Sequence, residues 1–277
     1  MAEAEPDSDS FGEKAVEARW RIAASLKALG KLSMTEQELR EILKQRRRLG
    51  SRTCVRTLLQ LSYVYRELGD LYLASVMARE CLDLAVEQRE PETQAGVLNT
   101  LCNILHDEGE FERACGNYRR ALEVIDGLGS RDEFRATVLT NLGGCLVALG
   151  RFDEGASLIR EAHTKAVERG YRRVAALALA RLGEAYLQHG DRTTARESFS
   201  ESDALASRSE EAYHDILFLN AFRRWEMARR DGNDTREKIA FGRLRHLRSL
   251  LERRFPEVEE FDHYVESVRR KHAHPSS

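Results

Sequence analysis

Apolar residues return in steps of three and four along this chain, and polar residues fill the positions between them. Ahead of Gly109, for example, the apolar positions are Leu98, Leu101 and Leu105. This spacing places side chains on one face of a helix, whereas a half-buried strand alternates apolar and polar positions. The pattern predicts an all-α chain of about thirteen helices in antiparallel pairs, with no sheet.

Glycines separate these helical segments at steps of 39 to 42 residues, and they are Gly30, Gly69, Gly109, Gly150, Gly190 and Gly232. Each glycine follows one apolar pattern and precedes the next. Glycine ends a helix without steric cost because it readily adopts the left-handed conformation. A fixed period of this size is typical of stacked helical repeats, in which each unit buries its apolar face against its neighbours. We therefore expect one continuous array of helix pairs.

Small residues occupy two fixed places in each repeating segment, where they let two helix backbones approach closely. One place lies ahead of the glycine and the other behind it: Ser62, Cys102, Gly143 and Gly183, then Ala74, Ala114, Gly155 and Ala195. A large residue also recurs, at Tyr65, Leu105, Leu146 and Tyr186. Together these positions resemble the tetratricopeptide repeat family over residues 55–207. The resemblance is looser over residues 13–48 and near Gly232, where Arg223 and Arg224 interrupt the apolar pattern.

This resemblance implies a right-handed superhelical solenoid of about six repeat units with a C-terminal capping helix. The period is longer than the usual length of about 34 residues and is similar to the long repeats of bacterial transcription-regulator sensor domains. We expect a disordered acidic tail at residues 1–11 and the solenoid at residues 12–254. A capping or docking helix is expected at residues 255–271, followed by a disordered tail at residues 272–277.

In the family, the first helices of successive units line a concave face. Counting from the glycines, the resemblance puts Asn99, Asn103, Asn141 and Arg181 on this face. The family's clamp for a peptide C-terminus uses Lys, Asn, Asn, Lys and Arg. Asn103, Asn141 and Arg181 match the two asparagines and the arginine, but Asn99 and Leu177 stand at the lysine positions. The resemblance therefore implies an incomplete clamp.

The asparagine amides have a binding logic of their own. Each amide offers both donors and an acceptor, so it can pair with the backbone of an extended peptide whatever the peptide sequence. Asparagine is also a poor helix former, which makes its repetition on one face costly. We predict that a peptide or protein segment binds in the groove through these four residues. The alternative is that the asparagines are exposed polar residues or join neighbouring helices.

Composition narrows the partner classes. The net charge of −2 produces no general field for nucleic acid or membrane surfaces. The first ten residues are acidic and lack the apolar core of a signal peptide, and no apolar run is long enough to span a membrane. The five cysteines form no CxxC pair, which favours reduced, buried thiols. We expect a cytoplasmic protein.

Catalytic and metal-binding patterns are missing from the sequence. The eight histidines are scattered, no Cys/His spacing suits zinc, and no phosphate loop or nucleophile elbow occurs. We therefore predict no enzymatic activity, no cofactor and no metal.

The last segment differs in charge from the rest. Residues 223–254 contain eleven Lys/Arg against five Asp/Glu, which suits either a solvated helix face or a phosphate-binding stripe. Pro256 then opens a final helix with one apolar face formed by Val258, Phe261, Tyr264 and Val265. This face fits a capping helix, and the alternative is a helix that forms a homodimer or docks a partner.

Two functions remain open from the sequence. The first is an adaptor or scaffold that holds a peptide or protein segment in its concave groove. The second is a sensor or regulatory module similar to those of bacterial transcription regulators, with its DNA-binding domain absent or supplied by a partner.

Overall fold

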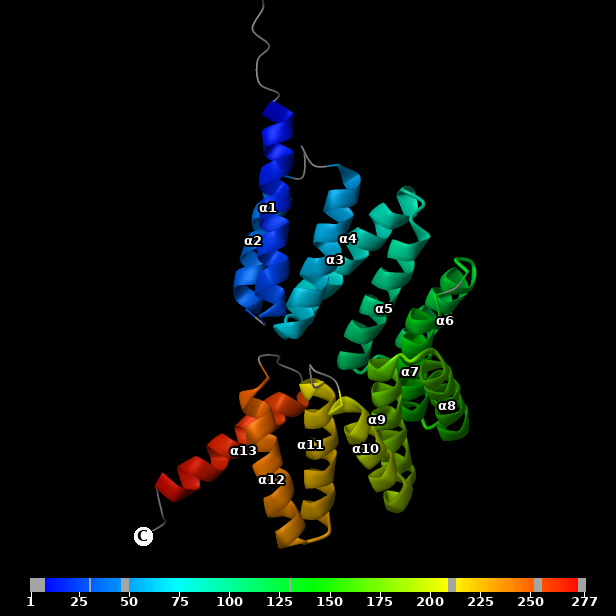
Figure 1. Cartoon of the computed structure of the whole chain (residues 1–277), viewed down its shortest axis with the longest axis vertical. Coiled ribbons are helices and arrows are strands. Elements are labelled where there is room, and N and C mark those ends of the chain that lie inside the picture. Colours follow the sequence, from blue (N-terminus) through cyan, green and yellow to red (C-terminus); the bar gives the residue numbers. More distant parts are fainter. Residues whose placement is uncertain are drawn as a thin grey trace, which may run out of the picture. The chain divides into compact units, whose positions relative to one another are not determined.

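The computed structural model describes residues 8–29, 31–45, 50–129, 131–208, 213–251 and 256–273. Within these ranges the chain forms thirteen α-helices and no strand (Figure 1). The predicted all-α class is therefore confirmed. Gly30 and the outermost residues of both expected tails lie outside the described residues.

Two compact units make up the structure, Met1–Ile104 and Leu105–Ser277. The first contains α1 (Ser8–Ala28), α2 (Leu32–Lys44), α3 (Ser51–Glu67), α4 (Leu71–Glu87) and most of α5 (Pro91–Asp107). The second contains α6 (Phe111–Asp126), α7 (Asp132–Ala148), α8 (Phe152–Arg169), α9 (Arg172–His189), α10 (Arg192–Ala206), α11 (His214–Arg230), α12 (Asp234–Ser249) and α13 (Pro256–Ala273). Because α1 starts at Ser8 and α13 ends at Ala273, helix replaces part of each expected tail.

The repeat glycines close helices as their spacing predicts. Gly69 has a φ of 83°, in the left-handed region, and the other described repeat glycines also have positive φ. Beside it, the Asp70 amide donates to the Tyr65 carbonyl at 2.9 Å, which completes a Schellman turn. The Asp70 carboxylate accepts a hydrogen bond from the Leu73 amide at 2.9 Å and so caps α4. One residue thus ends one helix and begins the next.

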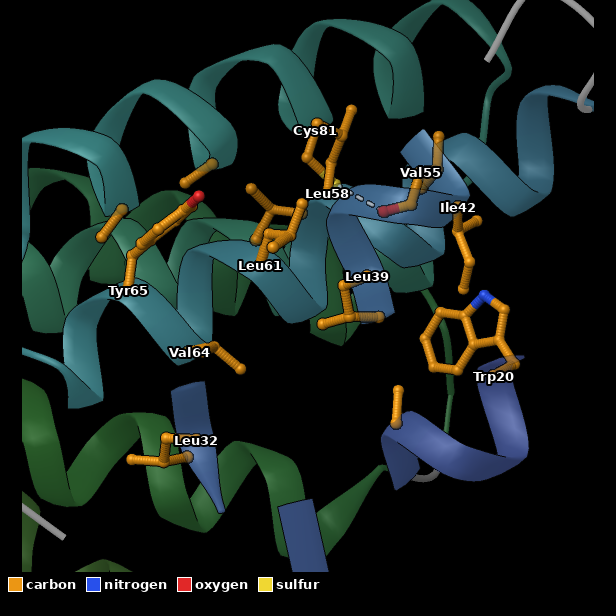
Figure 2. Close-up of a cluster of buried hydrophobic side chains, with 14 of the residues drawn as sticks. Trp20, Leu32, Leu39, Ile42, Val55, Leu58, Leu61, Val64, Tyr65 and Cys81 are labelled. Carbon is orange, nitrogen blue, oxygen red and sulfur yellow. Dashed lines mark hydrogen bonds between the residues drawn. The ribbon is translucent and has the colours of Figure 1, made fainter. Parts of the chain in front are cut away.

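The core of the first unit is largely aliphatic. Figure 2 shows side chains from several helices meeting there, including Trp20 from α1, Ile42 from α2 and Leu58 from α3. The Cys81 thiol donates to the Val55 carbonyl at 3.2 Å and joins α4 to α3 inside this core. Because all three apolar side chains named here are buried, this cluster holds the helices of the unit together.

Glycine lets two pairs of helices in the second unit approach closely. A Cβ placed on Gly143 of α7 would lie 2.6 Å from the backbone oxygen of Gly155 in α8. A Cβ on Gly183 of α9 would lie 2.6 Å from the ring of Phe199 in α10. Real Cβ contacts are not this short, so a side chain at either position would force the neighbouring helix or ring to move. Their predicted role as packing positions is confirmed.

The last helix closes the core of the second unit. Val258 and Phe261 of α13 are buried in an aromatic cluster with Phe218 and Trp225 of α11. The ring of Phe261 meets Trp225 edge to face, with 5.9 Å between ring centroids. These are the contacts of a capping helix. A homodimer through α13 stays a prediction.

Candidate functional site

Successive first helices lie side by side in the second unit. There α7 contacts α9, and α9 contacts α11. Asn141, Arg181 and Arg223 each stand nine residues before a repeat glycine and so occupy equivalent positions on these three helices. All three side chains are half-buried. We call this surface the first-helix face, and it comprises Thr137, Asn141, Arg181, Glu184, Arg223 and Glu226.

An ion-pair network fixes the charged part of this face. One guanidinium nitrogen of Arg181 (Nη1) donates to Glu184 at 2.7 Å, and Nε of Arg223 donates to the other oxygen of the same carboxylate at 3.0 Å. Arg223 also donates to Glu226 at 2.9 Å and to Glu257 at 2.6 Å. The network therefore joins α9, α11 and α13, and it presents alternating charges at fixed places.

The network shifts the pKa of its carboxyl groups in opposite directions. Burial alone would raise the pKa of Glu184, but the positive charges of Arg181 and Arg223 outweigh it and lower that pKa to about 2. At Glu257 burial dominates and raises the pKa, although Arg223 opposes this shift. The attraction of Glu184 raises the pKa of Arg181 despite the opposing effect of burial. Glu184 is thus a firmly ionised centre between two arginines.

A hollow lies beside α7, one helical turn before Asn141. This hollow of about 450 Å³ is lined by the first turns of this helix, including Glu133 and Thr137, together with Tyr171 at the start of α9. Thr137, which lines the hollow, precedes Asn141 by one helical turn. One turn beyond Asn141, a Cβ on Gly144 would lie 3.9 Å from Cδ of Arg181. The Asn141 turn and the arginine stem are therefore neighbours.

The four predicted site residues fall in different units. Asn99 and Asn103 lie one turn apart on the part of α5 that belongs to the first unit, and both are half-buried. Asn141 and Arg181 belong to the second unit, on neighbouring helices. Each of the three asparagines has an interaction partner. The structure thus brings Asn141 and Arg181 together, and it places Asn99 and Asn103 as a separate pair.

Sequence reasoning missed the partners of Arg181. Glu184, Arg223 and Glu257 were not recognised as part of the face, and Arg223 was read as an interruption of the apolar pattern. A signal was present, because Arg223 stands at the same distance from its glycine as Arg181 and Asn141.

Ion pairs also account for much of the basic stretch at residues 223–254. Arg224 pairs with Asp203 at 2.6 Å, and Arg248 pairs with Asp262 at 2.8 Å. Several arginines of this stretch are therefore held by internal carboxylates rather than forming a bare basic stripe.

A search of the described residues for metal-binding groups of three or more His, Cys, Asp or Glu finds none. All five cysteines are buried and none forms a disulfide bond. None of the described helices is both long and apolar enough to cross a membrane.

Comparison with known proteins agrees with the helical-repeat fold. Models of the tetratricopeptide repeat match residues 55–85 and 93–164. The helix pairs and their turns define an all-α helical-repeat solenoid. Within that class, these two stretches match the sequence pattern of tetratricopeptide repeats. A comparison with curated protein sequences finds no match.

Solved structures share this fold at low sequence identity. A Rap protein complexed with competence and sporulation factor is 16% identical, with a TM-score of 0.69 over 91% of this chain and 72% of that one. The apo form of RapI is 17% identical, with a TM-score of 0.69 over 85% of each chain. PlcR of Bacillus thuringiensis, in complex with the peptide PapR7 and DNA, is 13% identical, with a TM-score of 0.59 over 76% of this chain and 73% of that one. These likenesses show the fold.

Proposed function

We propose that this chain is a non-catalytic interaction scaffold that holds an extended peptide or protein segment on its first-helix face. The observation that carries the proposal is that Asn141 and Arg181 hold equivalent positions on neighbouring helices, with Asn141 one helical turn from the lining of a hollow of about 450 Å³. An amide can bind both the N–H and the C=O of a peptide backbone, and a guanidinium supplies further donors. Together they suit the main chain of an extended segment.

The ion-pair network supports binding by holding its groups in place. Arg181 is already oriented by Glu184, which Arg223 holds from the other side. Side chains that are ordered before binding lose less conformational entropy when a ligand arrives. Only part of the five-donor guanidinium of Arg181 is used by Glu184, so donors remain for a bound segment.

An internal segment of a partner fits this face better than a chain terminus. Leu177 stands at one lysine position of the family's carboxylate clamp, and Asn99 stands at the other. Neither side chain can supply the positive charge that neutralises a terminal carboxylate. Neutral amides recognise a backbone amide equally well anywhere along a peptide.

Asn99 and Asn103 enter the proposal as a second pair of amides, on the first unit. Their spacing of one helical turn lets both reach the same side of α5. They are tested separately from Asn141, because each pair belongs to its own unit.

A regulatory role is the second candidate, and the shared fold favours it. PlcR was solved with a peptide and DNA, and the Rap protein was solved with competence and sporulation factor. A sensor of this kind would bind a peptide and pass the signal to a partner protein. An electrophoretic shift assay with mixed DNA separates direct DNA binding, which would favour a transcription regulator, from the scaffold role. A cytoplasmic location also belongs to the proposal, since five cysteines without a disulfide bond suit a reducing compartment.

Peptide selection followed by matched variants tests the scaffold role. Peptides selected from a phage-displayed random library against the intact chain are synthesised with a fluorescein label, and their Kd is measured by anisotropy. We expect Asn141→Ala to weaken binding about three- to tenfold, the effect of one or two lost hydrogen bonds. Asn117→Ala is the control and should leave Kd unchanged, because Asn117 lies on α6, outside the first-helix face but within the same compact unit as Asn141.

The outcome that contradicts the proposal is equally clear. Equal binding by both variants, with a lower melting temperature for Asn141→Ala alone, would show that Asn141 has a structural role. Asn99→Ala with Asn103→Ala then asks the same question of the first unit.

A further inference from the structure

A second hollow lies on another surface of the second unit, between α10, α11 and α12. Its volume is about 380 Å³, within the range of roughly 300–1,000 Å³ that is usual for ligand sites. Four of the side chains that line it are arginines: Arg196, Arg224, Arg236 and Arg243. Among the described residues that line it, Asp231 is the only acidic one. The hollow is therefore basic, although the chain as a whole carries a net charge of −2.

Two carboxylates neutralise these arginines only in part. The Asp203 carboxylate forms ion pairs with the guanidinium groups of Arg224 at 2.6 Å and Arg243 at 2.9 Å. Asp231 receives Arg196 at 3.0 Å and also Arg192, which comes from outside the hollow. Each carboxylate is thus shared by two guanidinium groups, and positive charge is left over in the hollow.

Arg236 adds a cation that these carboxylates do not hold. It lies on the exposed side of α12, and within the described part of the chain its guanidinium has no ion-pair partner. Its backbone amide bonds to the Asn233 side chain, so the start of the helix does not depend on the guanidinium. Arg236 is therefore available to a ligand at the edge of the hollow.

Apart from Ser200, the rest of the lining is apolar. Ala221, Ala228 and Ala240 form part of the wall, and Ile239 of α12 also lines the hollow while remaining 69% exposed. A large aliphatic side chain left in water gains free energy when a ligand covers it. A phosphate backbone has no apolar part to cover Ile239, whereas a protein segment with acidic and aliphatic residues matches both features.

We propose that this hollow binds an acidic segment of a partner protein, with its carboxylates on the arginines and an aliphatic side chain against Ile239. Arginine forks bind carboxylates with two parallel hydrogen bonds, which gives orientation as well as affinity. The site is separate from the first-helix face, because its arginines come from α10 and α12 and from the Arg224 side of α11. Either surface can therefore be occupied without the other.

A labelled acidic peptide tests the site on the intact chain. The probe is fluorescein-Gly-Glu-Leu-Glu-Glu-Leu-Glu-amide, and its counterpart carries Gln in place of each Glu. We expect the acidic peptide to bind with a salt-sensitive Kd and the Gln peptide to bind at least tenfold more weakly. Arg236→Gln should weaken binding of the acidic peptide about tenfold. Ile239→Ser should weaken it severalfold, since it removes the apolar contact.

Arg245→Gln provides the matched control. Arg245 is exposed on the same helix and does not line the hollow. Its replacement by Gln changes the net charge by the same amount as Arg236→Gln. An equal loss in Arg236→Gln and Arg245→Gln would overturn the proposal, because binding would then follow net charge alone. Equal binding of the Gln peptide would also overturn it.

Inorganic phosphate distinguishes a protein ligand from a free anion. We expect phosphate in excess to compete weakly, in proportion to ionic strength. If phosphate alone saturates the hollow and its binding depends on Arg236, the site is a small-anion site and the proposed class of partner is wrong.

Discussion

The α7–α10 segment and the α11–α13 segment of the second unit pack their helices by opposite means. In α7–α10, glycines such as Gly143 and Gly183 bring the helices close, and alanines fill much of the remaining core. In α11–α13, large rings such as Phe218, Trp225 and Phe261 fill the core, and arginine ion pairs cover its edge. A close approach has no room for an added atom, whereas a core of large rings loses most when one ring is removed. The repeat pattern thus continues through both segments, while the packing chemistry changes.

The largest expected effect comes from emptying the aromatic core. Phe261→Ala should lower the free energy of unfolding by about 3–5 kcal/mol, because α13 loses its buried ring and the helix is held by few other apolar residues. Urea unfolding followed by circular dichroism measures the loss. His263→Ala, an exposed change on the same helix, should stay within about 0.5 kcal/mol of the parent. If the two variants unfold alike, α13 does not cap this core.

The next effect comes from adding one methyl group to the close approach. Gly143→Ala places a Cβ 2.6 Å from the Gly155 backbone oxygen and should cost about 1–3 kcal/mol. Gly144→Ala, at the next residue, meets nothing closer than 3.9 Å. That control should be neutral or stabilising by up to about 1 kcal/mol, since alanine favours helix over glycine. Thermal melting of the two variants side by side checks the contrast, and equal melting points would contradict it.

An effect of similar size distinguishes the two segments by its dependence on pH. The pKa of Glu184 is lowered from 4.5 to about 2 in the folded chain, so its stabilising contribution is complete above 4.5 and is lost as pH falls toward 2. We expect about 1–3 kcal/mol of such loss in the parent and less in Glu184→Gln. Urea unfolding at a series of pH values between about 2.5 and 6 measures both, across the window given by the lowered pKa. Parallel curves for the two proteins would show that the network does not lower this pKa.

The pKa of Glu257 shifts in the opposite direction to that of Glu184, which provides an internal check. Its raised pKa means that the folded chain holds this proton more tightly than the unfolded chain does. Its contribution therefore falls as pH rises through the raised pKa. Glu257→Gln should remove that decline and leave the acid-side loss from Glu184 in place.

The sequence predicted the helices and their close approaches well. The glycine spacing located the turns at Gly69, Gly109, Gly150, Gly190 and Gly232, because only a left-handed residue closes a helix so abruptly. Gly143 and Gly183 could be recognised because they stand where small residues recur in the repeat, and residue size is known directly from the sequence. The handedness of the superhelix and the six-unit count stay predictions.

The site was harder to predict from the sequence. A periodic pattern shows which face a charged residue occupies but does not name its partner, so the bonds from Glu184 to Arg181 and Arg223 were not foreseen. The division between Ile104 and Leu105 also falls inside one helix, where no break in apolar spacing marks it. Asn99 and Asn103 were therefore grouped with Asn141 and Arg181, although the two pairs belong to different units.

The turns that end one helix and cap the next have a consequence for how the chain folds. Asp70, Asp191 and Asn233 each accept the capping hydrogen bond of a new helix immediately after the preceding helix has closed. The hydrogen bonds that define a helix pair are thus formed between residues close in sequence. Chains rich in such local contacts fold quickly. Folding can begin in any pair and spread to its neighbours, as in other repeat arrays. A pair that opens can re-form from its own turn without waiting for distant parts of the chain.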